Sequence, residues 1–269
     1  MQSYVERYAY IKDKRRLKIL LQANTSQMKK IIKLMNQYIA DINNKESNLY
    51  FIFYNIFVKS AYDKIDKYSF INNINIGSCP YCNRSYIFSI DANKNLKAEI
   101  DHFYPKSLYP YLAISFYNLI PSCPTCNGLG AKGSNDSYRD GLKNPYEIKE
   151  NDFEFKLKIK SISIIDKKID NNSVDIYFKN KIDANDDYFQ LENLYKKHTD
   201  VVVELYQKLY QTDTKEHFKT LKKSLKSLSI SDDEIYKFIT CGYLNNEEFH
   251  KRPLNKFIKD ISKDLGYKI

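Results

Sequence analysis

Apolar residues in the first third of the chain recur every three or four positions, which is the period of a helix buried along one side. The longest such stripe consists of Met28, Ile31, Ile32, Met35, Ile39 and Ile42. Asn24, Thr25 and Ser26 stand before it, and residues of these types cap helix N-termini. Residues 49–65 are rich in Phe and Tyr and predict a second helix. We expect both apolar faces to form core.

The pattern changes from Tyr81 onward, where Pro, Gly, Asn and Cys become frequent and short extended segments replace the helical period. Residues 86–90 and 96–103 predict two strands on either side of the polar turn DANKN. Farther along, residues 153–159 alternate apolar and polar side chains, and the sequence VDIYF follows at 174–178. This alternation predicts a β-hairpin that is buried on one face.

The last third of the chain returns to helical periodicity. Its first apolar stripe consists of Leu191, Leu194, His198, Val202, Leu205 and Leu209. Three more helices are predicted near residues 215–228, 232–243 and 254–265. Together the patterns predict an α+β fold that is mainly helical, with a cysteine-rich centre and an inserted β-hairpin.

These patterns divide the chain into four regions. We expect a basic helical region at 1–78, a cysteine-rich core at 79–145, the β-hairpin at 146–183 and a helical region at 184–269. The sequence has neither an internal repeat nor a low-complexity linker, so the four regions are expected to form one compact domain.

The net charge of +10 at pH 7 is concentrated in residues 1–78, which contain 13 Lys and Arg against 6 Asp and Glu. Basic runs such as KDKRRLK and KKIIK can neutralise phosphates, which favours binding to nucleic acid. A lysine-rich composition of the kind that AT-biased coding produces explains the same excess. Charge alone leaves both interpretations open.

The chain is long enough to bury a core without disulfides, although it contains five cysteines. Charged residues interrupt positions 1–16, where a signal peptide needs an apolar segment. The longest uncharged stretch, residues 109–131, is broken by prolines, asparagines and glycines and does not predict a membrane span. We expect a soluble protein of the reducing cytoplasm, without a membrane partner.

Four of the cysteines form two C-x2-C pairs, Cys79 with Cys82 and Cys123 with Cys126. Each pair can turn two thiolates toward one point, and four thiolates complete a tetrahedral zinc site. Such a closed site leaves no position for a substrate, so we expect the zinc ion to be structural. A redox C-x-x-C, which would use one pair only, and an iron site are the alternatives.

Asp101 and His102 stand next to each other between the two cysteine pairs, and Asn118 and Asn127 follow. Because Mg²⁺ prefers oxygen ligands, Asp101 and Asn127 could hold such an ion together with phosphate and water. His102 would then be available as a general base toward water, since imidazole titrates near neutral pH. Asn118 could orient its second nitrogen through the side chain or the backbone carbonyl. A structural histidine in a turn is the competing interpretation.

The sequences EIDHFYPKS at 99–107, NLIPSC at 118–123 and CPTCN at 123–127 resemble HNH endonucleases of the ββα-metal type that carry a four-cysteine zinc knuckle. The resemblance implies a first strand that ends at Asp-His and a second strand that starts at the asparagine. It also implies a short helix that begins near the last Cys-Asn.

The same resemblance implies roles for single residues. His102 corresponds to the general base, Asp101 and Asn127 to ligands of a catalytic Mg²⁺ or Mn²⁺ ion, and Asn118 to the residue that positions His102. The separations agree, with 16 residues from His102 to Asn118 and 9 more to Asn127. The implied reaction is hydrolysis of a phosphodiester bond in nucleic acid, with DNA as the expected substrate and 5′-phosphate and 3′-hydroxyl ends as products.

One departure from the family concerns a lysine that usually lies three residues after the Cys-Asn asparagine. Here the sequence CNGLGAKG delays Lys132 to the fifth position, so the helix starts differently or its first turn is loose. By position, Arg84, Lys106 and Lys132 are candidate contacts to phosphate, and each is equally well explained as a solvated surface charge.

Residues 189–205 and 251–267 resemble the C-terminal helices of HNH proteins from bacterial anti-phage systems, such as the Septu and retron-associated nucleases. Those nucleases work beside an ATPase subunit, so the resemblance implies a role in antiviral defence and an ATPase partner. The competing hypothesis is a zinc-ribbon module that binds nucleic acid or protein without catalysis. It explains the cysteines and the charge, but not the spacing of Asp101, His102, Asn118 and Asn127.

Overall fold

The computed structural model describes residues 13–38, 44–90, 98–162, 169–211, 220, 223–224 and 229–267. The chain forms two compact units, and each is built from two stretches of sequence. The first unit contains Met1–Asn75 and Ile87–Ile148, and the second contains Ile76–Tyr86 and Lys149–Ile269. Each unit therefore joins stretches that are far apart in the sequence.

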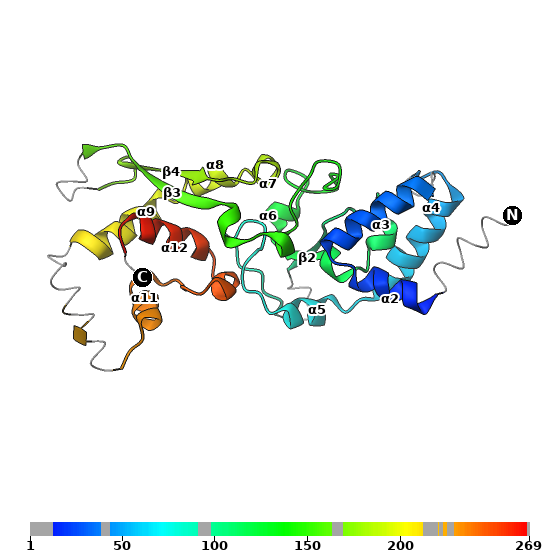
Figure 1. Ribbon diagram of the computed structural model, residues 1–269, viewed down its shortest axis with the longest axis horizontal. Helices are drawn as coiled ribbons and strands as arrows, with labels where there is room; N and C mark the ends of the chain where they lie inside the picture. Colours follow the sequence, from blue (N-terminus) through cyan, green and yellow to red (C-terminus); the bar gives the residue numbers. More distant parts are fainter. Residues whose placement is uncertain are drawn as a thin grey trace. The chain divides into compact units, whose positions relative to one another are not determined.

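The described part of the first unit begins with three helices, α2 (Lys14–Gln22), α3 (Thr25–Tyr38) and α4 (Asn48–Phe53) (Figure 1). The predicted stripe of α3 is confirmed for Met28, Ile32 and Met35, which are buried. The Oδ1 atom of Asn24 accepts a hydrogen bond from the backbone N–H of Gln27 at 2.9 Å, so Asn24 caps this helix as expected. Ile39 and Ile42 lie outside the described residues.

The helix predicted over residues 49–65 is present, but it changes type along its length. After α4 the chain continues as the π-helix η1 (Tyr54–Ala61) and the 3₁₀-helix η2 (Tyr62–Lys64). Helix α5 (Lys67–Ile74) follows, and the carboxylate of Asp66 caps its first turn. π-helical turns often lie at functional sites, and here one leads to Tyr62, which contacts His102.

Two short antiparallel strands lie in the centre of the first unit. They are β1 (Glu99–His102) and β2 (Leu119–Ser122), with His102 paired to Leu119. The strand predicted at 96–103 is thus shorter than expected, and residues 91–97 lie outside the described part. The strand predicted at 86–90 is wrong, because Tyr86 forms only an isolated bridge with Ser78 and residues 87–90 are not in a strand.

A one-turn helix, α6 (Pro124–Asn127), follows β2 directly. The resemblance implied a helix that begins near Cys126-Asn127, whereas α6 ends there. Pro124 at the first helical position starts the helix early, and the extended backbone of Gly128 ends it. The loop between β1 and β2 contains two 3₁₀ turns, η3 (Pro110–Leu112) and η4 (Phe116–Asn118).

The predicted hairpin forms the second unit's sheet, with β3 (Glu154–Ile159) antiparallel to β4 (Val174–Lys179). One face is buried as expected, and it packs on helix α12 (Asn255–Asp264) through contacts such as Phe155 against Phe257 at 5.2 Å between ring centroids. Figure 1 shows this helix running beside the hairpin. Burial ends before Ile159, which is 55% exposed.

Among the described residues, the remaining elements of the second unit are helical. They are η6 (Glu150–Asp152), α7 (Asp183–Phe189), α8 (Leu191–Tyr195), α9 (Thr199–Tyr206), the π-helix η8 (Gln207–Gln211), α11 (Asp232–Thr240) and η9 (Asn246–Lys251). The apolar stripe predicted from Leu191 onward is divided between α8 and α9, because a turn at 196–198 separates them.

The helices predicted at 232–243 and 254–265 are confirmed as α11 and α12, whereas most of 215–228 lies outside the described residues. A short 3₁₀ turn, η5 (Pro145–Glu147), closes the first unit. Within the described ranges, every helix is too short or too polar to span a bilayer.

Candidate metal centre and polar site

The first cysteine pair lies in a tight turn at residues 79–84. The backbone N–H of Asn83 bonds to the carbonyl of Cys79 at 2.7 Å, and Asn83 has a left-handed backbone with φ of 48°. The next N–H, from Arg84, points to the Sγ atom of Cys82 at 3.4 Å. Amide hydrogen bonds to sulfur are outer-shell contacts that stabilise a thiolate ligand. In the second unit the hydroxyl of Tyr195 also donates to the Cys82 carbonyl at 2.7 Å.

The second cysteine pair lies at the start of α6, directly after β2. Cys123 is the N-cap of α6 and Cys126 lies within the helix. The N–H of Asn127 bonds to the Cys123 carbonyl at 3.0 Å, which holds the turn between the two cysteines. One turn of helix therefore fixes this pair.

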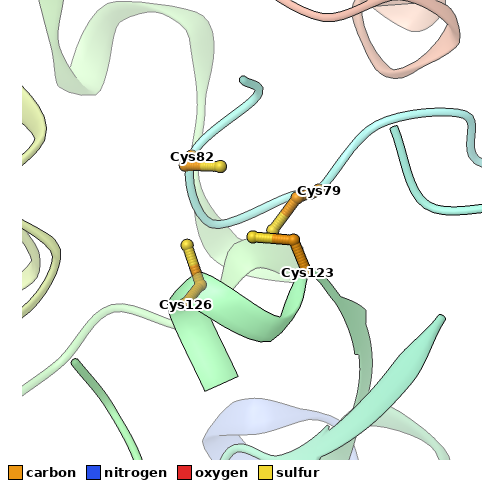
Figure 2. A group of neighbouring side chains, drawn as sticks. All are labelled: Cys79, Cys82, Cys123 and Cys126. Carbon is orange, nitrogen blue, oxygen red and sulfur yellow. The ribbon is translucent and has the colours of Figure 1, made fainter. Parts of the chain in front are cut away.

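All four cysteines are buried, and their Sγ atoms lie within 4.8 Å of one another. Figure 2 shows their side chains grouped around a common centre, two from a loop and two from α6 and its start. Zinc–sulfur bonds of about 2.3 Å in a tetrahedron require sulfur separations of about 3.8 Å, so small side-chain movements close the site. The cluster can bind a metal ion such as zinc, and four thiolates make that site a closed one.

His102 lies at the end of β1 with only 7% of its surface exposed. Its Nε2 atom is 3.1 Å from the carbonyl oxygen of Ala113. Because a carbonyl can only accept, Nε2 carries the hydrogen and Nδ1 keeps its lone pair in the neutral ring. The ring packs edge-on against Tyr62, with 4.3 Å between centroids. Burial, followed by the nearby charge of Lys106, lowers the pKa of His102 to about 3.

Asn118 is fully buried and holds the loop that carries Ala113. Its side-chain oxygen accepts from the N–H of Tyr104 at 2.7 Å, and its Nδ2 donates to the carbonyls of Tyr104 and Leu112 at 3.1 and 3.0 Å. We expected Asn118 to bond directly to the nitrogen of His102 that is not the base. In the structure that nitrogen, Nε2, instead bonds to the carbonyl oxygen of Ala113. Asn118 acts one step away, since it fixes Leu112, the neighbour of Ala113.

Asp101 forms a buried ion pair with Lys132. The Lys132 Nζ atom is 3.0 Å from Oδ1 of Asp101 and 2.8 Å from the carbonyl oxygen of His102, and the Lys132 side chain is 0% exposed. Burial lowers the pKa of Lys132 while the Asp101 carboxylate raises it. The suggestion that Lys132 contacts phosphate at the surface is therefore not supported by its position, because its ammonium group is enclosed and paired.

Replacing Lys132 by methionine is expected to destabilise the protein by about 3–5 kcal/mol, because it leaves the Asp101 carboxylate buried without a counter-charge. The free energy of unfolding in urea measures this. Lys30 on the exposed side of α3 offers a matched control, and Lys30→Met should change stability by less than about 0.5 kcal/mol. Equal stability of the two variants would contradict the prediction.

Asn127 contacts an acidic residue that sequence reasoning overlooked. Its Nδ2 donates to Oε2 of Glu99 at 2.7 Å. Glu99 and Asp101 are two residues apart in β1 and so project from the same face of the strand. The alternation of side chains along the strand EIDH could have indicated that Glu99 lies on the same face as Asp101. Two carboxylates and an amide oxygen are donor types that suit Mg²⁺ or Mn²⁺, although the ammonium of Lys132 already balances Asp101.

The other two predicted phosphate contacts have different surroundings. In the second unit, the half-buried Arg84 donates through Nε to Nε2 of His198 at 3.0 Å, and burial together with this guanidinium lowers the pKa of His198. Lys106 lies in the first unit, with Nζ 4.7 Å from the ring centroid of Tyr62. Lys106 therefore lies over the ring that packs on His102, whereas Lys132 contacts the His102 backbone from an enclosed position.

The fold and the buried sulfur cluster define an α+β protein with four clustered cysteines that could hold a metal ion. A stretch of 47 residues is 47% identical to the Septu protein PtuB of Bacillus thuringiensis. That alignment covers 18% of this chain and 18% of PtuB, far less than two thirds of either protein. No protein-family model matches the chain, and no solved structure matches it.

Proposed function

We propose that the protein is a metal-dependent endonuclease of the HNH type that hydrolyses phosphodiester bonds in nucleic acid, with DNA as the first substrate to test. The observation that carries the proposal is the state of His102. A backbone carbonyl fixes its tautomer, and it directly follows the carboxylate of Asp101 on the last residues of a strand. The likeness of one stretch to a Septu protein supports a role in anti-phage defence.

In this proposal His102 is the general base. Nδ1 accepts a proton from water, and the resulting hydroxide attacks the phosphorus atom while the bond to the 3′ oxygen breaks. The departing oxygen gains a proton from solvent, which leaves 5′-phosphate and 3′-hydroxyl ends. The imidazolium formed at His102 keeps its Nε2–H bond to Ala113, so the ring does not have to turn during the step.

The low pKa of His102 is consistent with a site whose positive charges are not balanced until an anion binds. After burial, the positive charges of Lys106, Lys132 and Lys67 are what lower this pKa. A phosphodiester group bound nearby would offset those charges and raise it toward the range in which an imidazole abstracts a proton well near neutral pH.

Asp101 and Asn127 are the residues that would hold the divalent ion, with Glu99 beside them. When bound, such an ion supplies positive charge that stabilises the oxygen atoms of the phosphate during cleavage. Lys132 donates to Oδ1 of Asp101, and a carboxylate oxygen can accept from more than one cation. Lys132 therefore holds Asp101 in a fixed orientation.

The four-cysteine cluster is proposed to bind zinc structurally, because four thiolates leave no open position for chemistry. An ATPase subunit is the proposed partner, on the sole basis of the resemblance to Septu nucleases. A nuclease is toxic to its own cell unless its activity is restrained. Inhibition by such a partner would provide that restraint.

The test is an assay of the purified chain, alone and with an ATPase encoded beside it, on labelled DNA and RNA. We expect cleavage with added Mg²⁺ or Mn²⁺, no cleavage when both are omitted, and 5′-phosphate ends on the products. Tight binding without cleavage under every condition would instead support the zinc-ribbon binding module.

A further inference from the structure

Two lysine side chains converge on the tyrosine that packs against His102. The Nζ atoms of Lys67 and Lys106 each lie 4.7 Å from the ring centroid of Tyr62. The nearby acid, Asp63, pairs with Lys59 at 3.7 Å. Within the described part of the chain, neither Lys67 nor Lys106 forms an ion pair with a carboxylate.

The positive charges of Lys67 and Lys106 repel each other, and a bound anion would offset this repulsion. Lys106 is half-buried, and burial followed by the charges of Lys67 and Lys59 lowers its pKa, against the opposing effect of Asp63. Cation–π contacts with Tyr62 offset part of the cost. A phosphate group would offset it more fully, because it brings opposite charge and several hydrogen-bond acceptors.

An aromatic cluster adjoins the lysines through helix α5. Phe70, three residues after Lys67 and therefore beside it on the helix, packs on Phe116 with 5.8 Å between ring centroids. The ring centroid of Tyr146 lies 6.2 Å from that of Phe116 and 5.1 Å from that of Tyr117. These rings are not sealed in a core, since Phe116 is 42% exposed and Tyr146 is 41% exposed.

We propose that the α5 surface, defined as Lys67, Phe70, Lys106, Phe116 and Tyr146, binds an unpaired nucleic-acid strand, with phosphate at the lysines and bases stacked on the exposed rings. The inference rests on the proposed function, because it assigns the substrate class of the same site. Stacking needs a free base face, which a single strand, loop or flipped base provides and an intact duplex does not. The basic pair beside the rings favours nucleic acid over a protein partner.

The phosphate part is tested in the His102→Ala background, so that binding is measured without cleavage. Fluorescence anisotropy with a labelled single strand should show at least tenfold weaker binding for Lys67→Ala/Lys106→Ala. The slope of log affinity against log salt should fall by about 1.4, at about 0.7 for each lost phosphate contact on a single strand. The exposed pair Lys158→Ala/Lys179→Ala on the hairpin of β3 and β4 removes the same charge and should change affinity less than twofold.

The stacking part is tested with Phe116→Ala. Loss of one stacking ring should weaken single-strand binding about 5- to 150-fold and leave the weak binding of a matched duplex unchanged. Phe238→Ala, which removes a 70% exposed ring from α11, is the control and should behave like the parent. Circular dichroism melts establish that each variant is folded.

The outcomes separate this inference from the proposed function. If the wild type cleaves nucleic acid and the α5-surface variants bind and cut single strands normally, the inference is overturned. The proposed nuclease function is then still supported. Binding that depends on the α5 surface without any cleavage supports the inference and removes the nuclease. Variants that bind nucleic acid normally but no longer bind the ATPase subunit would show a protein-docking surface, which also overturns it.

Discussion

Replacement of His102 by alanine is expected to slow phosphodiester cleavage by about 10²- to 10⁴-fold, the usual contribution of a positioned general base. No other group in the proposed mechanism takes the proton from water. The initial rate of nicking with Mg²⁺ or Mn²⁺ measures the effect. His250, in the short helix η9 of the second unit, provides the control, and His250→Ala should retain full activity.

A second variant separates chemistry from structure. The amide N–H of glutamine can donate to the Ala113 carbonyl as Nε2 of His102 does, but glutamine has no basic nitrogen. His102→Gln should therefore stay closer to wild-type stability than His102→Ala and be just as inactive. If His102→Gln kept more than a tenth of the activity, the imidazole would not be the base.

Replacement of Cys123 by serine is expected to abolish metal binding and to lower the melting temperature by more than about 10 °C. Structural zinc sites contribute about 10–16 kcal/mol of binding free energy to folding. Loss of about 5 kcal/mol of this would shift the melting temperature by about 10–20 °C in a domain of this size. Zinc content per chain and thermal unfolding are the two measurements.

Cys241 supplies the matched control for this experiment. It is exposed, lies at the end of α11 and is outside the four-cysteine cluster. Cys241→Ser should keep one zinc ion per chain and an unchanged melting temperature. A Cys123→Ser protein that bound zinc and melted like this control would show that the cluster is not a structural metal site.

The helix of Met28, Ile32 and Met35 and the hairpin of residues 154–179 were predictable because each follows a local period, and one buried face is enough to reveal it. The strand expected at 86–90 failed for the opposite reason. Its apolar residues suit a strand, but a strand also needs a partner strand beside it, and the local sequence does not show whether one is present. In the structure Tyr86 has only a single bridge partner.

The candidate site divides in the same way. The sequence by itself determined the two cysteine pairs and the Asp101-His102 step, because their geometry depends on two intervening residues or on none. Only the tertiary structure decided that Ala113 holds His102, that Lys132 is enclosed against Asp101, and that Lys67 and Lys106 meet over Tyr62. Those contacts join residues that are distant along the chain, and burial is a property of everything packed around a residue rather than of its neighbours in sequence.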